Sequence, residues 1–156
     1  MNKKVVVFSQ LDQDVLQRLQ AQYHVVVINP KQGDVNEQIR EQVKDADAMI
    51  GAGRLLNESN LATAQQLKII SSVSVGYDNY DLAYLNQKKI WLTNTPHVLT
   101  ETTADLAFTL LMSAARKVPY LDQWTKQGHW QRTVGEAQFG HDIFGKTLGI
   151  IGLGNI

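Results

Sequence analysis

The sequence predicts an α/β fold with a mostly parallel, doubly wound sheet, and three observations predict it. Short apolar runs rich in β-branched residues recur through residues 1–98. Each run is followed by a segment whose composition or apolar spacing is typical of a helix. An Asp or Asn stands in front of several of these segments, where it can cap a helix. Because strands that alternate with helices form right-handed βαβ units, this order indicates a parallel sheet.

Five strands are expected from the apolar runs. The second of them is broken by the pair Asn29-Pro30, which is a turn signal. The expected strands are residues 5–9, 25–28, 48–51, 68–73 and 90–93. Together with their helices they predict a flavodoxin-like domain over residues 1–98.

Four helices are expected between these strands. Asp12 can cap the first, in which Val15, Leu16 and Leu19 share one face. Asn57 and Asp81 are placed to cap the third and the fourth. The second, third and fourth helices are expected at residues 36–44, 57–65 and 81–88.

The pattern changes after Pro96, which we expect to end this domain. A long helix is predicted over residues 100–118, because Leu106, Leu110, Leu111 and Ala114 follow helical spacing, and Pro119 is expected to stop it. A second helix over 120–127, a loop with Trp130 and Phe139 as anchors, and a strand over 147–151 are expected next. The predicted division is residues 1–98, 99–145 and 146–156.

Composition excludes several classes of function. The formal net charge is +0, which gives no electrostatic argument for nucleic acid or an anionic membrane. The chain has no cysteine, so a disulfide scaffold, a zinc-thiolate site and a cysteine nucleophile are excluded. No apolar run approaches the length of a membrane span, and the apolar run near the N-terminus is too short for a signal peptide. We therefore expect a cytoplasmic protein without a metal.

Three glycine-containing stretches are candidates for ligand binding. Gly152 and Gly154 follow the last expected strand and begin a G-x-G-x-x-G pattern, in which glycines let backbone N–H groups approach a pyrophosphate. In residues 72–79 the turn at Val75-Gly76 offers a small anion nest beyond a strand end. The alternative there is an ordinary loop with Gly76 at positive φ, which the local pattern favours.

The third stretch is residues 51–54, in which glycines and Arg54 follow another strand. Arginine is suited to bidentate recognition of a carboxylate, although a flexible loop with a solvated arginine is the interpretation that we prefer from this pattern alone. Four histidines remain, and no pair of them has metal-ligand spacing. They are His24, His97, His129 and His141.

These stretches taken together resemble the D-isomer-specific 2-hydroxyacid dehydrogenases, and most of all the bacterial glyoxylate/hydroxypyruvate (2-ketogluconate) reductases of that family. Their order and spacing match the family along the whole chain, which is far more specific than any single motif. The resemblance is carried by residues 72–82 (SVSVGYDNYDL), 95–117, 128–130 (GHW) and 145–156 (GKTLGIIGLGNI).

The resemblance implies a substrate domain and a Rossmann coenzyme domain with the active site between them. It implies that backbone N–H groups of Val75 and Gly76 hold the substrate carboxylate and that Gly53-Arg54 flank the substrate. It further implies that Thr103 faces the nicotinamide, and that the last residues begin the first strand and the pyrophosphate loop of the coenzyme domain. The implied loop residues are Gly152, Gly154, Asn155 and Ile156.

The resemblance also implies a small 2-oxo acid substrate, NADPH or NADH as cofactor, and a homodimer held by residues 99–145. The family's catalytic arginine, glutamate and histidine are expected beyond Ile156, so we expect no turnover from this chain alone. A phospho-receiver is rejected, because the third strand ends at Gly51 and the fifth at Thr93-Asn94. The remaining alternative is a non-catalytic α/β module that binds a ligand or dimerises.

Overall fold

The computed structural model describes residues 3–156, which form two units that divide between Pro96 and His97. The first unit contains every strand of the described chain. The second contains two α-helices, a short 3-10 helix, η2 (Glu136–Gln138), and irregular stretches around it. No helix among residues 3–156 is long and apolar enough to cross a bilayer.

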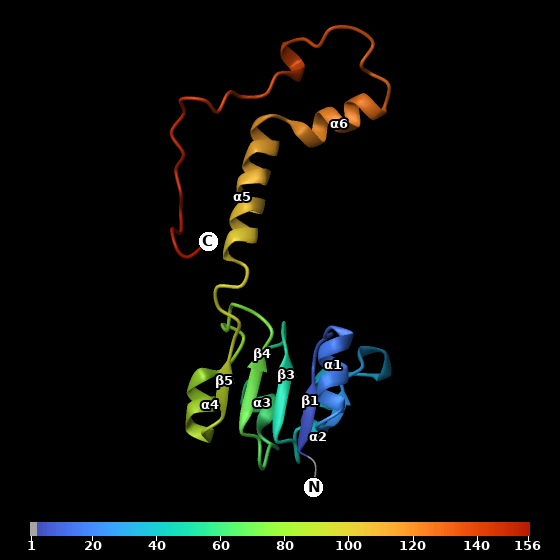
Figure 1. Ribbon diagram of the computed structural model, residues 1–156, viewed down its shortest axis with the longest axis vertical. Helices are drawn as coiled ribbons and strands as arrows, with labels where there is room; N and C mark the ends of the chain where they lie inside the picture. Colours follow the sequence, from blue (N-terminus) through green and yellow to red (C-terminus); the bar gives the residue numbers. More distant parts are fainter. Residues whose placement is uncertain (1–2) are drawn as a thin grey trace. The chain divides into compact units, whose positions relative to one another are not determined.

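The first unit is built on a five-stranded parallel sheet with the order β2-β1-β3-β4-β5 (Figure 1). This order is the doubly wound, flavodoxin-like arrangement, so the expected fold class is confirmed, and the strand order reverses between β1 and β3. The strands are β1 (Lys4–Val7), β2 (His24–Val27), β3 (Ala48–Gly51), β4 (Ile69–Ser72) and β5 (Trp91–Thr93).

Four α-helices and a short 3-10 helix connect the strands. They are α1 (Gln13–Gln20), η1 (Pro30–Gln32), α2 (Val35–Gln42), α3 (Glu58–Leu61) and α4 (Leu82–Lys88). Side chains cap α3 and α4 as expected, since Asn57 accepts from the N–H of Ser59 and Asp81 from that of Tyr84. Two expectations were wrong: Asp12 stands before α1 without a capping hydrogen bond, and α3 ends well before residue 65.

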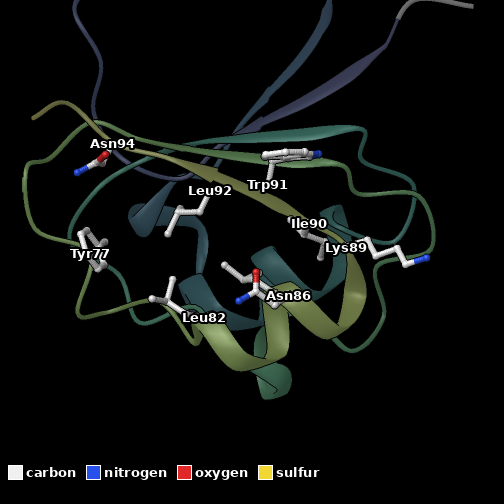
Figure 2. A pocket seen from close by; sticks show the side chains of 9 residues that line it. Tyr77, Leu82, Asn86, Lys89, Ile90, Trp91, Leu92 and Asn94 are labelled. Carbon is white, nitrogen blue, oxygen red and sulfur yellow. The ribbon is translucent and has the colours of Figure 1, made fainter.

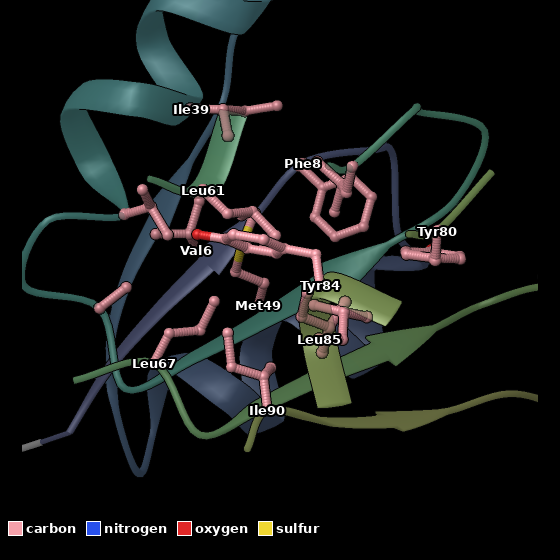
Figure 3. Packing of buried hydrophobic residues seen from close by; sticks show 14 of the residues in the cluster. Val6, Phe8, Ile39, Met49, Leu61, Leu67, Tyr80, Tyr84, Leu85 and Ile90 are labelled. Atoms are coloured by element: carbon pink, nitrogen blue, oxygen red, sulfur yellow. The ribbon is translucent and has the colours of Figure 1, made fainter. Parts of the chain in front are cut away.

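The core of the first unit lies on one face of the sheet. Met49 on β3 and Ile70 on β4 are almost fully buried and belong to one cluster with Ile39 from α2 and Leu61 from α3. Figure 3 shows Met49, Ile39 and Leu61 in this cluster. Right-handed crossovers explain this, because in this strand order α2, α3 and α4 cover one face while α1 covers the other. None of the residues of α1 is buried. The buried face therefore fixes the positions of the strand ends on which the candidate site is built.

The second unit begins with α5 (Thr100–Ala115) and α6 (Val118–Lys126). The long helix is shorter than expected, because Lys117 adopts a left-handed conformation that breaks it. Pro119 does not stop α5 but lies in the first turn of α6, where a missing N–H costs nothing. Residues 137–141 lie against the junction of α5 and α6, where the N–H of His141 donates to Ala115 O at 2.8 Å.

The strand expected over residues 147–151 is not formed, so that prediction was wrong for the described chain. A strand needs a neighbour to accept its hydrogen bonds, and the unit that starts at His97 contains no other strand. The apolar side chains of the segment are exposed instead, Ile150 by 59% and Ile151 fully.

Candidate functional site

The loops that follow β1, β3 and β4 meet at the carboxyl edge of the sheet. Hydrogen bonds join them in a row: the N–H of Ala52 donates to Ser9 Oγ at 3.0 Å, and that of Val73 donates to Gly51 O at 3.0 Å. In open α/β sheets, ligands bind beyond the carboxyl ends of the strands. This row of loops is therefore the candidate site, and it contains Gly53, Arg54, Val75 and Gly76.

The loop after β4 is held in shape by its own side chains. Ser74 donates to Gly76 O at 2.7 Å and lies 2.6 Å from Ser72 Oγ, which in turn accepts from the buried Tyr80 hydroxyl. From the neighbouring strand, Asn94 Nδ2 donates to Val75 O at 2.8 Å. The carbonyls of Val75 and Gly76 are thus both engaged, and the loop is fixed at each of them.

The N–H groups of the same two residues remain free. Within residues 3–156 neither the Val75 nor the Gly76 N–H has a hydrogen-bond acceptor. Gly76 does not adopt a positive φ, so the conformational explanation of this glycine was wrong. A Cβ at this position would contact only Asp78 Oδ2, at 3.6 Å. The loop therefore presents two adjacent donors with open space beside one of them, which is an arrangement that suits an anion.

The loop after β3 depends on its glycines. Gly51 lies so close to the buried Phe8 ring that a Cβ would be 2.8 Å from Phe8 Cδ2, and Gly53 adopts a φ of 71°. Arg54 is half-buried, and its carbonyl accepts a short hydrogen bond from Asn79 Nδ2, which ties this loop to the loop after β4. In the described chain the Arg54 guanidinium has no ion pair.

A hollow of about 700 Å³ lies next to the candidate site, between α4 and β5 (Figure 2). Leu82, Ile90 and Leu92 line it, with Asn86 and Lys89 as polar neighbours. Tyr77 and Asn94 connect its rim to the loop after β4. Its lining contains no acid and no histidine, and Lys89 and Tyr77 are its only titratable side chains.

The loop after β4 also carries Tyr77 and Asp78, whereas the histidines and the carboxylates with a shifted pKa lie outside the site. His24 begins β2 and is therefore at the amino edge, and His97 belongs to the second unit with a φ of 66°. Among residues 3–156 no cluster of His, Asp or Glu is suited to hold a metal ion. A hydrogen bond from Lys4 lowers the pKa of Asp45, and one from Lys3 lowers the pKa of Asp47, but both carboxylates precede β3 at the amino edge.

The residues expected to meet a dinucleotide do not form a cradle for one in the described chain. Gly152 has a φ of 82° and Gly154 has open space around its Cα, yet no strand precedes them and no helix follows. A pyrophosphate site of this type needs both. Asn155 and Ile156 are exposed, and Thr103 is half-buried in the first turn of α5. These five positions do not fit the cofactor by themselves.

Sequence reasoning found the two glycine loops but missed the residues that hold them. Ser74, Asn79 and Asn94 each fix a carbonyl of the site, and Ser9 fixes the loop after β3. Each of these polar residues lies on a loop that follows a strand, and a polar residue in such a loop is the signal that could have identified them.

Comparison with known proteins identifies the family of the chain. Residues 5–147 match the family described as D-isomer specific 2-hydroxyacid dehydrogenase, catalytic domain. The chain is 36% identical to a probable 2-ketogluconate reductase of Dictyostelium discoideum, with 99% of this chain and 47% of that protein covered. It is also 36% identical to glyoxylate/hydroxypyruvate reductase B of Citrobacter koseri, with 100% and 48% covered.

Solved structures agree as well. The NADPH-dependent glyoxylate/hydroxypyruvate reductase of Sinorhizobium meliloti, in complex with citrate, matches with a TM-score of 0.79 at 30% identity, over 99% of this chain and 47% of that one. The same enzyme in complex with NADP and malonate matches with a TM-score of 0.76. The chain spans about half the length of the curated relatives that it matches. The family match covers most of the chain, and the chain therefore belongs to the D-isomer specific 2-hydroxyacid dehydrogenases.

Proposed function

We propose that this chain supplies the substrate-binding part of an oxidoreductase that reduces a small 2-oxo acid to the D-2-hydroxy acid. Glyoxylate and hydroxypyruvate are the substrates proposed, with NADPH or NADH as the reductant. The observation that carries the proposal is the pair of free N–H groups at Val75 and Gly76, on a loop fixed at both carbonyls. The names of the relatives support it, and so does the malonate bound by the Sinorhizobium meliloti reductase.

In this proposal the substrate carboxylate accepts from the N–H groups of Val75 and Gly76. Gly53 and Arg54 flank the substrate from the neighbouring strand end, and Asn79 keeps their loop beside that of Val75. The N–H pair binds and orients the acid through donors that do not themselves titrate.

The cofactor contacts are proposed for the assembled enzyme. Thr103, Gly152, Gly154, Asn155 and Ile156 would contact NADPH or NADH once residues 147–151 are paired as a strand, and the bound nicotinamide would supply the hydride. The complex of the Sinorhizobium meliloti reductase with NADP supports this type of cofactor.

The chain alone is proposed to be inactive. Reduction of a 2-oxo acid needs a group that gives a proton to the carbonyl oxygen. The loops of the candidate site contribute N–H groups, amides, hydroxyl groups, one arginine, Tyr77 and Asp78, and no histidine. Pure 156-residue protein mixed with NADPH and hydroxypyruvate should show no protein-dependent loss of absorbance at the nicotinamide band. A rate that grows with protein concentration would contradict this part of the proposal.

Carboxylate binding can be tested in the same protein. We expect hydroxypyruvate to shift the amide resonances of Val75 and Gly76 in ¹⁵N-labelled chain. Gly76→Pro deletes one N–H and should weaken binding about tenfold, since a charge-assisted hydrogen bond is lost. Gly149→Pro is the matched control, because Gly149 is exposed, lies outside the loop and has no neighbour within 4 Å. If neither amide responds to the acid, the proposed function fails.

A homodimer is also proposed, formed through the second unit. Leu106, Phe108 and Leu110 on α5 are each more than half exposed, and an apolar surface of this kind is typical of an interface. The same surface supports the second candidate function, a non-catalytic dimerisation module. Sedimentation should show a dimer in either case, and hydroxypyruvate binding separates the two, because only the enzyme part requires it.

A further inference from the structure

A cavity of about 670 Å³ opens at the point where the strand order reverses. It lies beside the loops after β1, β2 and β3, and the ring of Phe8 is part of its wall. In flavodoxin-like sheets this reversal between β1 and β3 is the place where ligands bind. The Val75-Gly76 loop is not part of the cavity wall, so the cavity is additional to the proposed carboxylate site.

The lining of the cavity is rich in donors and contains no acid. The Arg54 guanidinium has no ion pair within residues 3–156. Asn29 uses its Oδ1 to accept from the N–H of Lys31, which leaves its NH₂ group without an acceptor. Gln10 and Gln32 carry exposed amides to which the structure assigns no partner. An unpaired cation among neutral polar groups attracts negative charge, because no carboxylate in the wall neutralises it.

Backbone N–H groups add to the preference of the cavity for an anion. In the described chain the N–H groups of Ser9 and Gly53 have no acceptor, although both residues line the cavity. Free N–H groups at strand ends form concave sites for anions. Arg54, the Asn29 amide and the backbone at Ser9 and Gly53 therefore all present donors in one wall.

Arg54 and the proposed carboxylate site lie on loops that follow neighbouring strands. Arg54 follows β3 and Val75-Gly76 follow β4, and neighbouring strands are separated by about 4.8 Å. The hydrogen bond from Asn79 to Arg54 O keeps the two loops together. Two carboxylates joined by a chain of three carbons are separated by roughly one such strand spacing.

We infer that this cavity binds a second anionic group of the substrate, so that the preferred 2-oxo acid is a dianion with a distal carboxylate or phosphate. Arg54 is the specificity residue. Gln10 supports it from the end of the neighbouring strand β1, and Asn29 contributes a donor from the end of β2, one strand farther away. The inference rests on the proposed function, because the first carboxylate is taken to lie at Val75-Gly76.

The test compares three 2-oxo acids on the 156-residue chain by calorimetry and amide shifts. Hydroxypyruvate has one anion and a short tail, 2-oxoglutarate has a second carboxylate, and 2-keto-D-gluconate has a long uncharged tail. We expect 2-oxoglutarate to bind about tenfold tighter than hydroxypyruvate, and 2-keto-D-gluconate to gain far less. Raised salt should reduce the advantage, since it depends on charge.

Arg54→Met should bring the ratio of the two affinities, 2-oxoglutarate over hydroxypyruvate, close to one, and Arg54→Lys should restore part of it. Arg18→Met is the matched control, because Arg18 is an exposed arginine on α1 without an ion pair in the described chain. It should leave the ratio unchanged. Amide shifts at Ser9 and Gly53 should appear with 2-oxoglutarate and not with hydroxypyruvate.

Each failure has a distinct meaning. Hydroxypyruvate binding with no advantage for 2-oxoglutarate overturns the inference and leaves the proposed function intact. An equal gain for 2-keto-D-gluconate overturns it too, because the cavity would then recognise hydroxyl groups. Inorganic phosphate that binds as tightly as 2-oxoglutarate would make the cavity a site for a separate anion, against the inference. Loss of binding for all the acids rejects the proposed function itself.

Discussion

The two units of this chain use apolar residues in opposite ways. Residues 3–96 bury a continuous cluster that includes Val6, Ile39 and Met49, each at most 1% exposed. Among residues 97–156 no side chain is buried, and Phe144 and Ile151 are almost completely exposed. The first unit thus carries its own hydrophobic stabilisation, whereas the second has apolar surface and nothing described that covers it.

This difference shows which properties are local. Most of the stability of a helix in a protein comes from tertiary packing, because nucleation is costly and propensity adds little per residue. The second unit therefore depends on a surface that covers α5 and the segment around Ile150. The Val75-Gly76 loop needs no such cover, since the loop after β3 and Asn94, which follows β5, hold it from within the first unit.

The largest expected effect tests the first half of this comparison. Met49→Ala removes a side chain that is 1% exposed between β3 and the helices, and it should cost about 2–5 kcal/mol of the free energy of unfolding. Chemical denaturation followed by circular dichroism measures this cost. Leu110→Ala is the counterpart on α5, where the side chain is 60% exposed, and it should change stability by less than about 0.5 kcal/mol.

Similar losses of stability in Met49→Ala and Leu110→Ala would contradict this difference between the two units. A large loss in Leu110→Ala at dilute concentration would mean that α5 is covered within one chain. A loss that appears only at concentrations where the protein dimerises would instead support the proposed dimer.

The next largest effect is expected when alanine replaces a glycine that has no room for a Cβ, which should cost about 1–3 kcal/mol of the free energy of unfolding. Gly51→Ala forces a methyl group against the Phe8 ring, which is 3% exposed and cannot move aside, so the whole first unit should lose stability. Gly140→Ala creates a closer clash, 2.6 Å from Ala115 O, in a unit without a core. It should detach only the loop, seen as faster amide exchange at His141, with the sheet unaffected.

Gly149→Ala is the control for this pair, because a Cβ there has no neighbour within 4 Å. It should change neither the stability nor the amide exchange of His141. A global loss of stability in Gly140→Ala would show that the two units unfold together, against the comparison.

The sequence was most informative where structure depends on local signals. The five strands were placed within one or two residues, because β-branched runs and capping residues such as Asn57 and Asp81 mark both ends of each βα step. The strand over 147–151 failed for the opposite reason, since its apolar pattern is real but its partners are not in the second unit. The left-handed Lys117 between α5 and α6 carries no signal of the glycine type, so the helix end was misplaced.

The candidate site was predictable in position more than in detail. Strand ends and glycines located the loops of Arg54 and Val75-Gly76, and the family resemblance gave the N–H pair its proposed role. Two details could not be predicted: Gly76 has no positive φ, and Asn79 and Asn94 fix the loops. Both depend on contacts between segments far apart in the sequence. The cavity beside Arg54 combines three strand ends, and no short stretch of sequence contains it.

The smallest expected effect concerns the edge of the sheet opposite the site. Asp47 accepts from Lys3 Nζ at 2.8 Å and from the N–H of Lys4 at 2.9 Å, and these bonds lower its pKa in the folded chain. A lowered pKa stabilises the fold above the unfolded value of about 3.9, and the contribution is lost as the pH falls through the folded value.

Asp47→Asn should therefore lower the melting temperature slightly at pH 7, and the difference from the parent chain should shrink as the pH falls below about 4. Added salt should reduce it at neutral pH, because the Lys3 side chain is exposed. Asp142→Asn, in the coreless unit and without a hydrogen bond from a side chain, should show no such trend. A difference at Asp47 that persists unchanged to pH 3 would assign the effect to neutral hydrogen bonding. The amino edge of β1 and β3 would then be held without the charge of Asp47, and acid would leave that edge of the first unit intact.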